Sequence, residues 1–185
     1  MPTGTGVFTN AYRQKYANLA DGTVSNPVEM PLLYFLVGEG GFQTVDGVKV
    51  PKTPDPSRTA LESTLLITIP VTPPPGGPLP GETSVTGGYF PKALVASDVV
   101  VSASNVTVTC VLSANEPFLD NLSKLDPQPS PIRPQLFELG LFDGGPDNYP
   151  FSWGLSTATM MAYCTFPLVV KHQGIPVTIR VDLTL

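Results

Sequence analysis

The sequence is short of charge, histidine and cysteine, and each shortage excludes a class of function. Only 14% of its 185 residues are charged, against about 25% in an ordinary soluble domain. The single histidine, His172, stands in an expected turn, with no serine in a nucleophile-elbow context to complete a catalytic triad. The two cysteines, Cys110 and Cys164, cannot form a disulfide framework and lack metal-ligand spacing, so we expect two buried thiols.

Positive charge and long apolar runs are also missing. The net charge is −5 and the pI is about 4.7, which argues against nucleic-acid binding, because that calls for basic patches. The longest apolar run, PLLYFLVG at 31–38, is far too short to span a bilayer. The N-terminal residues carry no apolar signal core. We therefore expect neither a nucleic acid nor a membrane as partner.

Motifs for cofactors and metals are absent from the sequence as well. The glycines of VGEGGF do not lead into the Gly-Lys-Ser/Thr ending of a phosphate loop. Glu138, Asp143 and Asp147 form no Asp-x-Asp calcium loop, and turn formation explains the Asp and Gly residues of FDGGPDNYP. We expect no cofactor, no metal and no enzymatic activity.

Apolar residues, proline and glycine are what the sequence has in quantity. Hydrophobic residues make up 42%, and a folded monomer with so few charges would expose an apolar surface, so we expect partner chains to cover much of it. The 22 prolines and 17 glycines form about a fifth of the chain, below the roughly 25–30% typical of low-complexity disorder. Many turns and few long helices are expected.

One helix is predicted near the N-terminus, from a single apolar stripe at helical spacing. The stripe consists of Phe8, Tyr12, Tyr16 and Leu19. Thr9 or Asn10 could cap its start, and Gly22 fits its end.

The rest of the pattern has the period of strands. Apolar or alternating runs of strand length occupy residues 32–38, 65–71, 106–112, 136–142, 160–166 and 175–185. The last run alternates most regularly, and its eleven residues would reach about 36 Å, so we expect it to bend or leave the sheet. The sequence predicts one α+β, mainly β domain over residues 1–185: an antiparallel sheet or sandwich with one N-terminal helix and long Pro/Gly-rich loops.

Two loops are candidates for contact with other molecules. The stretch at 72–88 is too long for a hairpin turn and is expected to project as a stiff arm, at about 72–98, that touches a neighbouring chain; a polyproline ligand is the alternative. The candidate contact residues of the arm are Pro73, Pro74, Pro75, Pro78 and Pro80. In the loop at 143–159, Trp153 with Tyr149 and Phe151 either covers the core or forms a sugar-stacking platform.

A glutamate in the middle of an apolar strand raises a separate question. In LFELGLF (136–142), one predicted face is Phe137, Leu139 and Leu141, and the other carries Glu138 beside apolar residues and Gly140. Both faces are mostly apolar, so the strand is expected to be buried on both sides. Glu138 is then either a paired buried charge or a surface group at a sheet edge.

Four segments, in this order, resemble the N-terminal attachment domain of bacteriophage tail fibres. They are YFLVGEGGF (34–42), PKTPDPSRTALES (51–63), LFELGLFDGG (136–145) and MMAYCTFPLVVKHQGIPVTIRVDLTL (160–185). The family pattern has a strand ending in Gly-Asp/Glu-Gly-Gly, a Pro-x-Pro-x-x-Thr-x-Leu segment, a Glu-Ile-Gly-Leu-Phe-Asp strand, a strand with a later lysine, and a final alternating strand. The matching motif residues are Gly38, Glu39, Gly40, Gly41, Glu138, Gly140, Asp143 and Lys171.

The resemblance implies a structural protein of the virion tail, made in the bacterial cytoplasm. In that family the domain anchors a fibre to the baseplate of a contractile tail and is usually trimeric. The insertion at 72–98 and the absence of a following fibre shaft depart from the family, so we expect an adaptor that attaches or bridges fibres and binds other tail proteins. A receptor- or glycan-binding tail module and a neck or collar component are the alternatives.

The resemblance also places a lysine, Lys171, near the end of the strand that follows Glu138. Because 136–142 and 160–166 are neighbours in sequence, we expect them to pair antiparallel. Glu138 would accept hydrogen bonds from Lys171, or else Arg133, or from backbone N–H groups of the VGEGG turn, for which Gly140 leaves room. On this hypothesis Glu138→Leu costs little, whereas Glu138→Ala costs about 1–3 kcal/mol.

Overall fold

The computed structural model describes residues 2–14, 33–63, 66–70, 84–89, 92–102, 105–114, 116, 134–143, 159–172 and 174–184. These ranges hold twelve strands, a short 3₁₀ helix η1 (Ala96–Asp98), and a helical segment at 10–14. The strands are β1 (Thr3–Phe8), β2 (Leu33–Gly38), β3 (Phe42–Val45), β4 (Val48–Pro51), β5 (Leu66–Pro70), β6 (Ser84–Tyr89), β7 (Lys92–Ala93), β8 (Val99–Ser102), β9 (Asn105–Leu112), β10 (Gln135–Asp143), β11 (Thr159–Val170) and β12 (Val177–Thr184).

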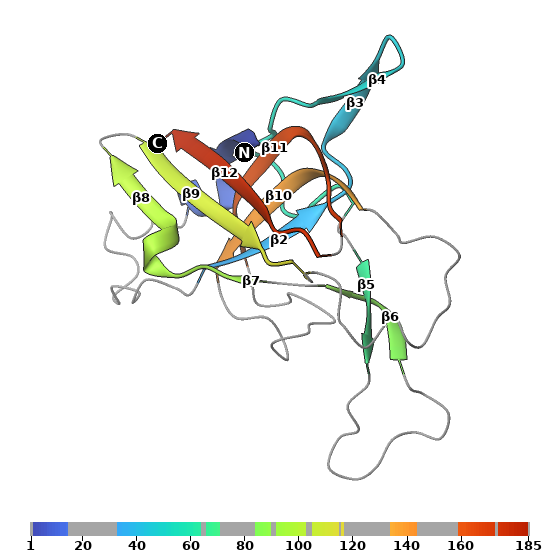
Figure 1. The fold of residues 1–185 in the computed structure, drawn as a ribbon. Helices are drawn as coiled ribbons and strands as arrows, with labels where there is room; N and C mark the ends of the chain where they lie inside the picture. The colour runs from blue at the N-terminus through green and yellow to red at the C-terminus, as the bar shows by residue number, and fades with distance from the viewer. Residues whose placement is uncertain are drawn as a thin grey trace.

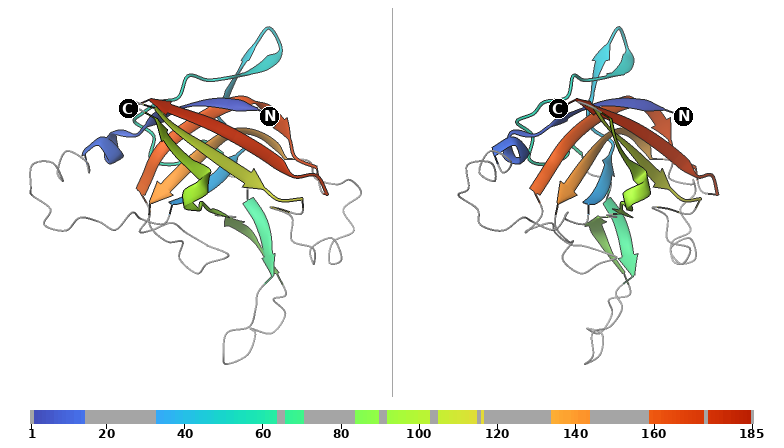
Figure 2. Two further views of the ribbon diagram at one scale, coloured as in Figure 1. Left: turned by 60° about the vertical axis from the view of Figure 1, so that its left-hand side comes forward. Right: turned by 90° about the vertical axis from the view of Figure 1, so that its left-hand side faces the viewer.

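Eight of the strands form one curled sheet, in the order β7-β2-β10-β11-β1-β12-β9-β8 (Figure 1). The two edge strands, β7 and β8, are joined by residues 94–98 alone. A chain from Ala93 to Val99 spans no more than about 22 Å, so the sheet has to bring its edges near one another. Figure 2 shows the resulting curl, with β9 and β12 on one wall and β2 and β10 on the other.

The mainly β prediction is confirmed, and its finer form is corrected. One mixed sheet curls on itself, where the sequence predicted an antiparallel sheet or sandwich. The sheet is mixed because β1 lies parallel to β12 on one side and antiparallel to β11 on the other. The described part of the chain contains very little helix, and none there is long and apolar enough to cross a membrane.

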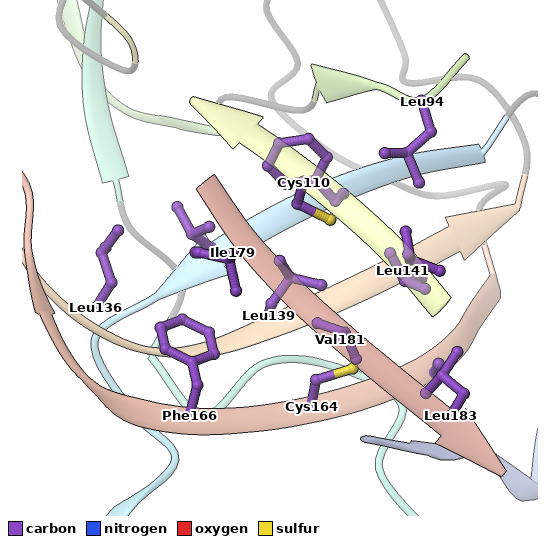
Figure 3. Packing of buried hydrophobic residues seen from close by; sticks show 14 of the residues in the cluster. Leu94, Cys110, Leu136, Leu139, Leu141, Cys164, Phe166, Ile179, Val181 and Leu183 are labelled. Carbon is purple, nitrogen blue, oxygen red and sulfur yellow. The ribbon is translucent and has the colours of Figure 1, made fainter. Parts of the chain in front are cut away.

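The main core fills the inside of the curl. Figure 3 shows side chains of β9 and β12 pointing toward those of β10 and β11. The fully buried members from these strands include Cys110, Leu136, Leu139, Cys164, Phe166, Ile179 and Val181. Along β12, Ile179, Val181 and Leu183 face this core, as the regular alternation predicted. Both cysteines are free and buried, as expected.

Strands β10 and β11 pair antiparallel, which confirms the pairing predicted for 136–142 and 160–166. The pairing shifts register between Leu136 and Glu138, and a shift of this kind changes which face a residue occupies. Leu136 therefore joins the core cluster, while the ring of Phe137 packs on Phe42 with 4.8 Å between centroids. The predicted grouping of Phe137 with Leu139 is wrong for this reason.

The helix begins at Asn10, two residues after Phe8, the first residue of the apolar stripe. Phe8 is the last residue of β1, and 10–14 are the helical residues that the structure describes. Thr9 caps its start as predicted: its Oγ1 accepts a hydrogen bond from the Tyr12 N–H at 3.2 Å. The rings of Phe8 and Tyr12 still stack, with centroids 5.1 Å apart.

Two small antiparallel ribbons project from the curled sheet (Figures 1 and 2). Strands β3 and β4 form a hairpin that was not predicted from the sequence, with Asp46 and Gly47 at positive φ in its turn. Strands β5 and β6 form the second ribbon. The loop and arm predicted at 72–98 are wrong for residues 84–89, which form β6, and for residues 92–98, which belong to β7, η1 and the buried Leu94. Residues 71–83 lie outside the described residues.

Candidate functional site

The carboxylate of Glu138 lies fully buried on the outer face of β10 and is bonded by four donors. Oε1 accepts from the N–H groups of Gly40 at 3.1 Å and Ser63 at 2.8 Å. Oε2 accepts from the Glu62 N–H at 3.0 Å and the Tyr163 hydroxyl at 2.8 Å. A buried charge without partners costs several kcal/mol, and here backbone donors supply most of what it needs. The prediction that the VGEGG turn donates to Glu138 is confirmed.

Three glycines of the sequence GEGG wrap this carboxylate. A Cβ on Gly38 or Gly40 would stand 2.5 or 2.6 Å from Glu138 Oε1. A Cβ on Gly41 would stand 2.8 Å from the Glu138 Cβ, and this residue also has φ of +74°. Gly41 therefore needs to be glycine for two reasons, its left-handed backbone and the close approach of the strand.

The second wall of the site is residues 52–63, which cross the outer face of the sheet. The Glu62 carboxylate accepts from the Gly41 N–H at 3.1 Å, from Lys52 Nζ at 2.8 Å and from Arg58. The Arg58 guanidinium lies 5.8 Å from the Tyr163 ring centroid. These contacts, which we call the Glu62 cluster, join the GEGG turn to residues 52–63 on the outer side of the buried Glu138.

Two ionisable groups of the site have shifted pKa values. Burial raises the pKa of Glu62, but hydrogen bonds from Lys52 and Gly41 and the charge of Arg58 outweigh it, so the net pKa is lowered. Burial, followed by the hydrogen bond to Glu138, raises the pKa of Tyr163 well above its ordinary value. Tyr163 therefore remains a hydrogen-bond donor across the physiological range.

Gly140 serves a different contact from the predicted one. A Cβ there would come 2.7 Å from Cε2 of Phe142 and 3.0 Å from the Met160 Cε. The missing side chain thus makes room for the Phe142 ring, in a small outer cluster with Leu36, Leu61 and Tyr163. The expectation that Gly140 admits the VGEGG turn is wrong.

Lys171 does not supply the cation for Glu138. Its fully buried ammonium donates to the carbonyl oxygens of Ala114 at 2.8 Å, His172 at 2.9 Å and Ile175 at 2.6 Å. Burial lowers the pKa of Lys171, and the nearby Glu116 carboxylate opposes this shift. Lys171 fastens the loop ends beside β9 and β12, and the prediction of a Lys171–Glu138 pair is wrong.

The remaining motif residues, Glu39 and Asp143, accept hydrogen bonds from backbone N–H groups at the ends of strands. Glu39 is exposed, and its Oε1 accepts from the Gln135 N–H at 3.0 Å. Asp143 is buried, and its Oδ1 accepts from the Thr159 N–H at 3.0 Å, where β10 and β11 separate. The candidate contacts Pro73, Pro74, Pro75, Pro78, Pro80 and Trp153, with Arg133, lie outside the described residues.

Some parts of this site were predicted from the sequence and others were not. The glycines of GEGG and the isolated glutamate of β10 were both identified from the sequence. Glu62, Ser63 and Tyr163 were missed, because no local pattern distinguishes a backbone N–H or a hydroxyl that contacts a residue about 25 to 75 positions away.

The hydrogen bonds of this site fit a structural role for Glu138. A carboxylate offers about four lone-pair positions, and the four donors occupy them, so Glu138 has no lone pair left for a substrate proton. Across the described ranges, no group of three or more His, Cys, Asp or Glu residues could hold a metal ion. One open pocket of about 520 Å³ is not lined by Glu138; its lining residues are Pro2, Leu168, Val169, Pro176, Val177 and Thr178.

Comparisons with models of protein families, with curated proteins and with solved structures give no match to this chain.

Proposed function

We propose that the chain is a structural protein of a phage tail that attaches or bridges tail fibres at the baseplate. The observation that carries the proposal is the convergence on Glu138 of all four segments that resemble the fibre-attachment family. The first segment gives the GEGG turn, the second Glu62 and Ser63, the third Glu138 itself, and the fourth Tyr163. Residues of all four segments, from Gly40 to Tyr163, thus share one physical purpose.

That purpose is to hold a rigid outer layer on the sheet. The Gly41 carbonyl accepts from the Lys52 N–H at 2.9 Å, which closes the base of the β3–β4 hairpin directly above Glu138. Lys49 adds a cation–π contact to Phe42, at 4.3 Å from the ring centroid. A saturated buried network of this kind fixes geometry, which is what a domain that positions another protein requires. It supports a mechanical role and no enzymatic one.

The surface supports assembly with other chains. Few charges cover it, and several large apolar side chains are exposed, among them Val100 (59%), Val101 (64%) and Ile175 (55%). In our proposal the partners are other tail, baseplate or fibre proteins and further copies of this chain, in a trimer. Neither a nucleic acid nor a membrane has a part in it.

Gold-labelled antibodies against the chain, applied to purified particles of the phage that encodes it, test the proposal. Label at the end of the tail is expected, and antibody pre-absorbed with the recombinant protein should remove it. Label at the head–tail junction would favour a neck component, and particles that lack the chain altogether would overturn the proposal. Binding of the recombinant protein to bacterial surface glycans would favour the receptor-binding alternative.

A further inference from the structure

Strand β8 is an edge strand of the main sheet. It pairs with β9 on one side, and the described residues place no strand on its other side. In an antiparallel pair, alternate residues direct their N–H and C=O groups away from the partner strand. The side chains are exposed as well: Val100 by 59% and Val101 by 64%.

Apart from its short length of four residues, this edge lacks the features that keep edge strands from pairing. Soluble proteins protect such edges with lysine, proline, an inward-pointing charge or a bulge. Strand β8 reads Val-Val-Val-Ser and pairs with β9 in continuous register, without a bulge. Three β-branched residues in a row favour an extended strand, and they carry no charge that would repel a second strand. The chemistry that fits this edge is a second strand of low charge.

We propose that two copies of the chain pair antiparallel through their β8 strands and so continue one sheet across a two-fold axis. The occupant is a second copy because the strand is complementary to itself. It carries no charge that would repel its own image, although the chain as a whole has a net charge of −5. The proposal stands whether or not the chain belongs to a tail. In a trimeric assembly, this contact would join copies from different trimers.

The two-fold axis restricts the register. Residues directly opposite in an antiparallel pair lie on the same face of the sheet, so the axis has to pass through a residue pair. Centred on Val100, it sets Val100 against Val100 of the other copy and Val101 against Val99. A register centred on Val101 would set Ser102 against Val100, whereas the Val100 register pairs valine only with valine, so we assign the Val100 register.

The contact is weak when it acts alone. A stable interface buries at least about 1,000 Å², and a four-residue strand edge offers only part of that area. Pairing through β8 therefore depends on concentration, and it gains strength where other contacts already hold many copies together. A covalent trap suits such a contact better than a measurement at equilibrium alone.

Cysteine cross-linking tests both the contact and its register. The native Cys110 and Cys164 are buried, so the variants Val100→Cys, Val101→Cys and Val48→Cys each add one accessible thiol. Under mild oxidation with oxidised glutathione, two Val100→Cys chains should join into a disulfide dimer on a non-reducing gel. Val101→Cys, which faces Val99 in this register, should do so several-fold less. Val48→Cys, at the equally exposed hairpin, measures cross-linking by random collision.

A charge variant provides an independent measurement. Val100→Lys should lower the dimer fraction in sedimentation velocity, whereas Val48→Lys, with the same charge change, should leave it unaltered. Equal cross-linking of Val100→Cys and Val48→Cys would overturn the proposal. Preferred cross-linking of Val101→Cys would overturn the assigned register. Matching circular dichroism spectra and melting temperatures establish that every variant is folded.

Discussion

The hydroxyl of Tyr163 on β11 donates to the Glu138 carboxylate on β10 at 2.8 Å, and both residues are fully buried. Tyr163 stands opposite Gly140, while Glu138 stands opposite Thr165, so the bond runs diagonally between the two strands. It is the one side-chain contribution among the four hydrogen bonds to Glu138. Removing the Tyr163 hydroxyl therefore tests the cross-strand hydrogen bond separately from the three backbone N–H groups that also donate to Glu138.

Tyr163→Phe should destabilise the protein by about 1.5–3 kcal/mol, the range for a hydrogen bond to a charged group. The ring stays in its outer cluster, so little packing is lost. Urea unfolding of Tyr163→Phe, Glu138→Gln and the double variant gives the interaction energy between the two residues. Strictly additive effects would contradict a direct bond of this strength.

Glu138→Leu should destabilise strongly, contrary to what the sequence alone led us to expect. A leucine would be tolerated if the partner were a removable cation. The partners are instead the N–H groups of Gly40, Glu62 and Ser63, which leucine leaves buried without acceptors at about 1–3 kcal/mol each. We expect Glu138→Leu and Glu138→Ala each to cost more than about 3 kcal/mol, measured by urea unfolding. A leucine variant as stable as the parent protein would show that these three N–H groups do not need the carboxylate as an acceptor.

Gly41→Ala should cost more than Gly47→Ala, although both glycines have nearly the same backbone angle. Their φ values are +74° and +79°, so both alanines carry the left-handed penalty of about 1–2 kcal/mol. A Cβ on Gly47 meets nothing within 4 Å, whereas one on Gly41 meets the Glu138 Cβ at 2.8 Å. The difference between the two melting temperatures isolates crowding at the carboxylate. Equal shifts would mean that the turn moves away freely.

Local pattern predicted those parts of the fold whose cause is local. The alternation of β12 and the antiparallel pairing of β10 with β11 follow from period and proximity in sequence. The buried acceptor role of Glu138 followed from the cost of an unpaired charge. Each of these inferences needs only neighbouring residues.

The parts that were missed depend on distant contacts, or on a signal that was passed over. Strand β1 has glycine where an apolar residue would reveal the pattern, because a Cβ on Gly6 would stand 2.5 Å from Cys164 Sγ. The partners of Lys171 are carbonyl oxygens, and any residue carries one. The β3–β4 hairpin, by contrast, could have been found from its Asp46-Gly47 turn between alternating residues.

Removal of residues 72–82 should leave the fold intact and weaken assembly. The deletion keeps β5 (Leu66–Pro70) and β6 (Ser84–Tyr89), which pair from Leu66↔Tyr89 to Pro70↔Ser84, if an Asn-Gly turn rejoins them. Unchanged circular dichroism and melting temperature are expected, with reduced incorporation into particles in a complementation assay. A version of equal length with Ser in place of the prolines tests stiffness separately. Normal incorporation of the deletion variant would mean that the segment is a passive insertion.

Acid should weaken the fold through Glu62. Its folded-state pKa lies below the ordinary value of 4.5, so the ionised form is favoured in the folded protein. The resulting stability is present above about pH 4.5 and is lost as the pH falls through the lowered pKa. The difference in unfolding free energy between the parent protein and Glu62→Gln should therefore be constant from about pH 7 to about pH 5 and shrink below that. Glu116 also has a lowered pKa, but it titrates alike in both proteins and cancels in the difference. A difference that persists undiminished at about pH 2 would show that the charge of Glu62 contributes nothing to the stability of the fold.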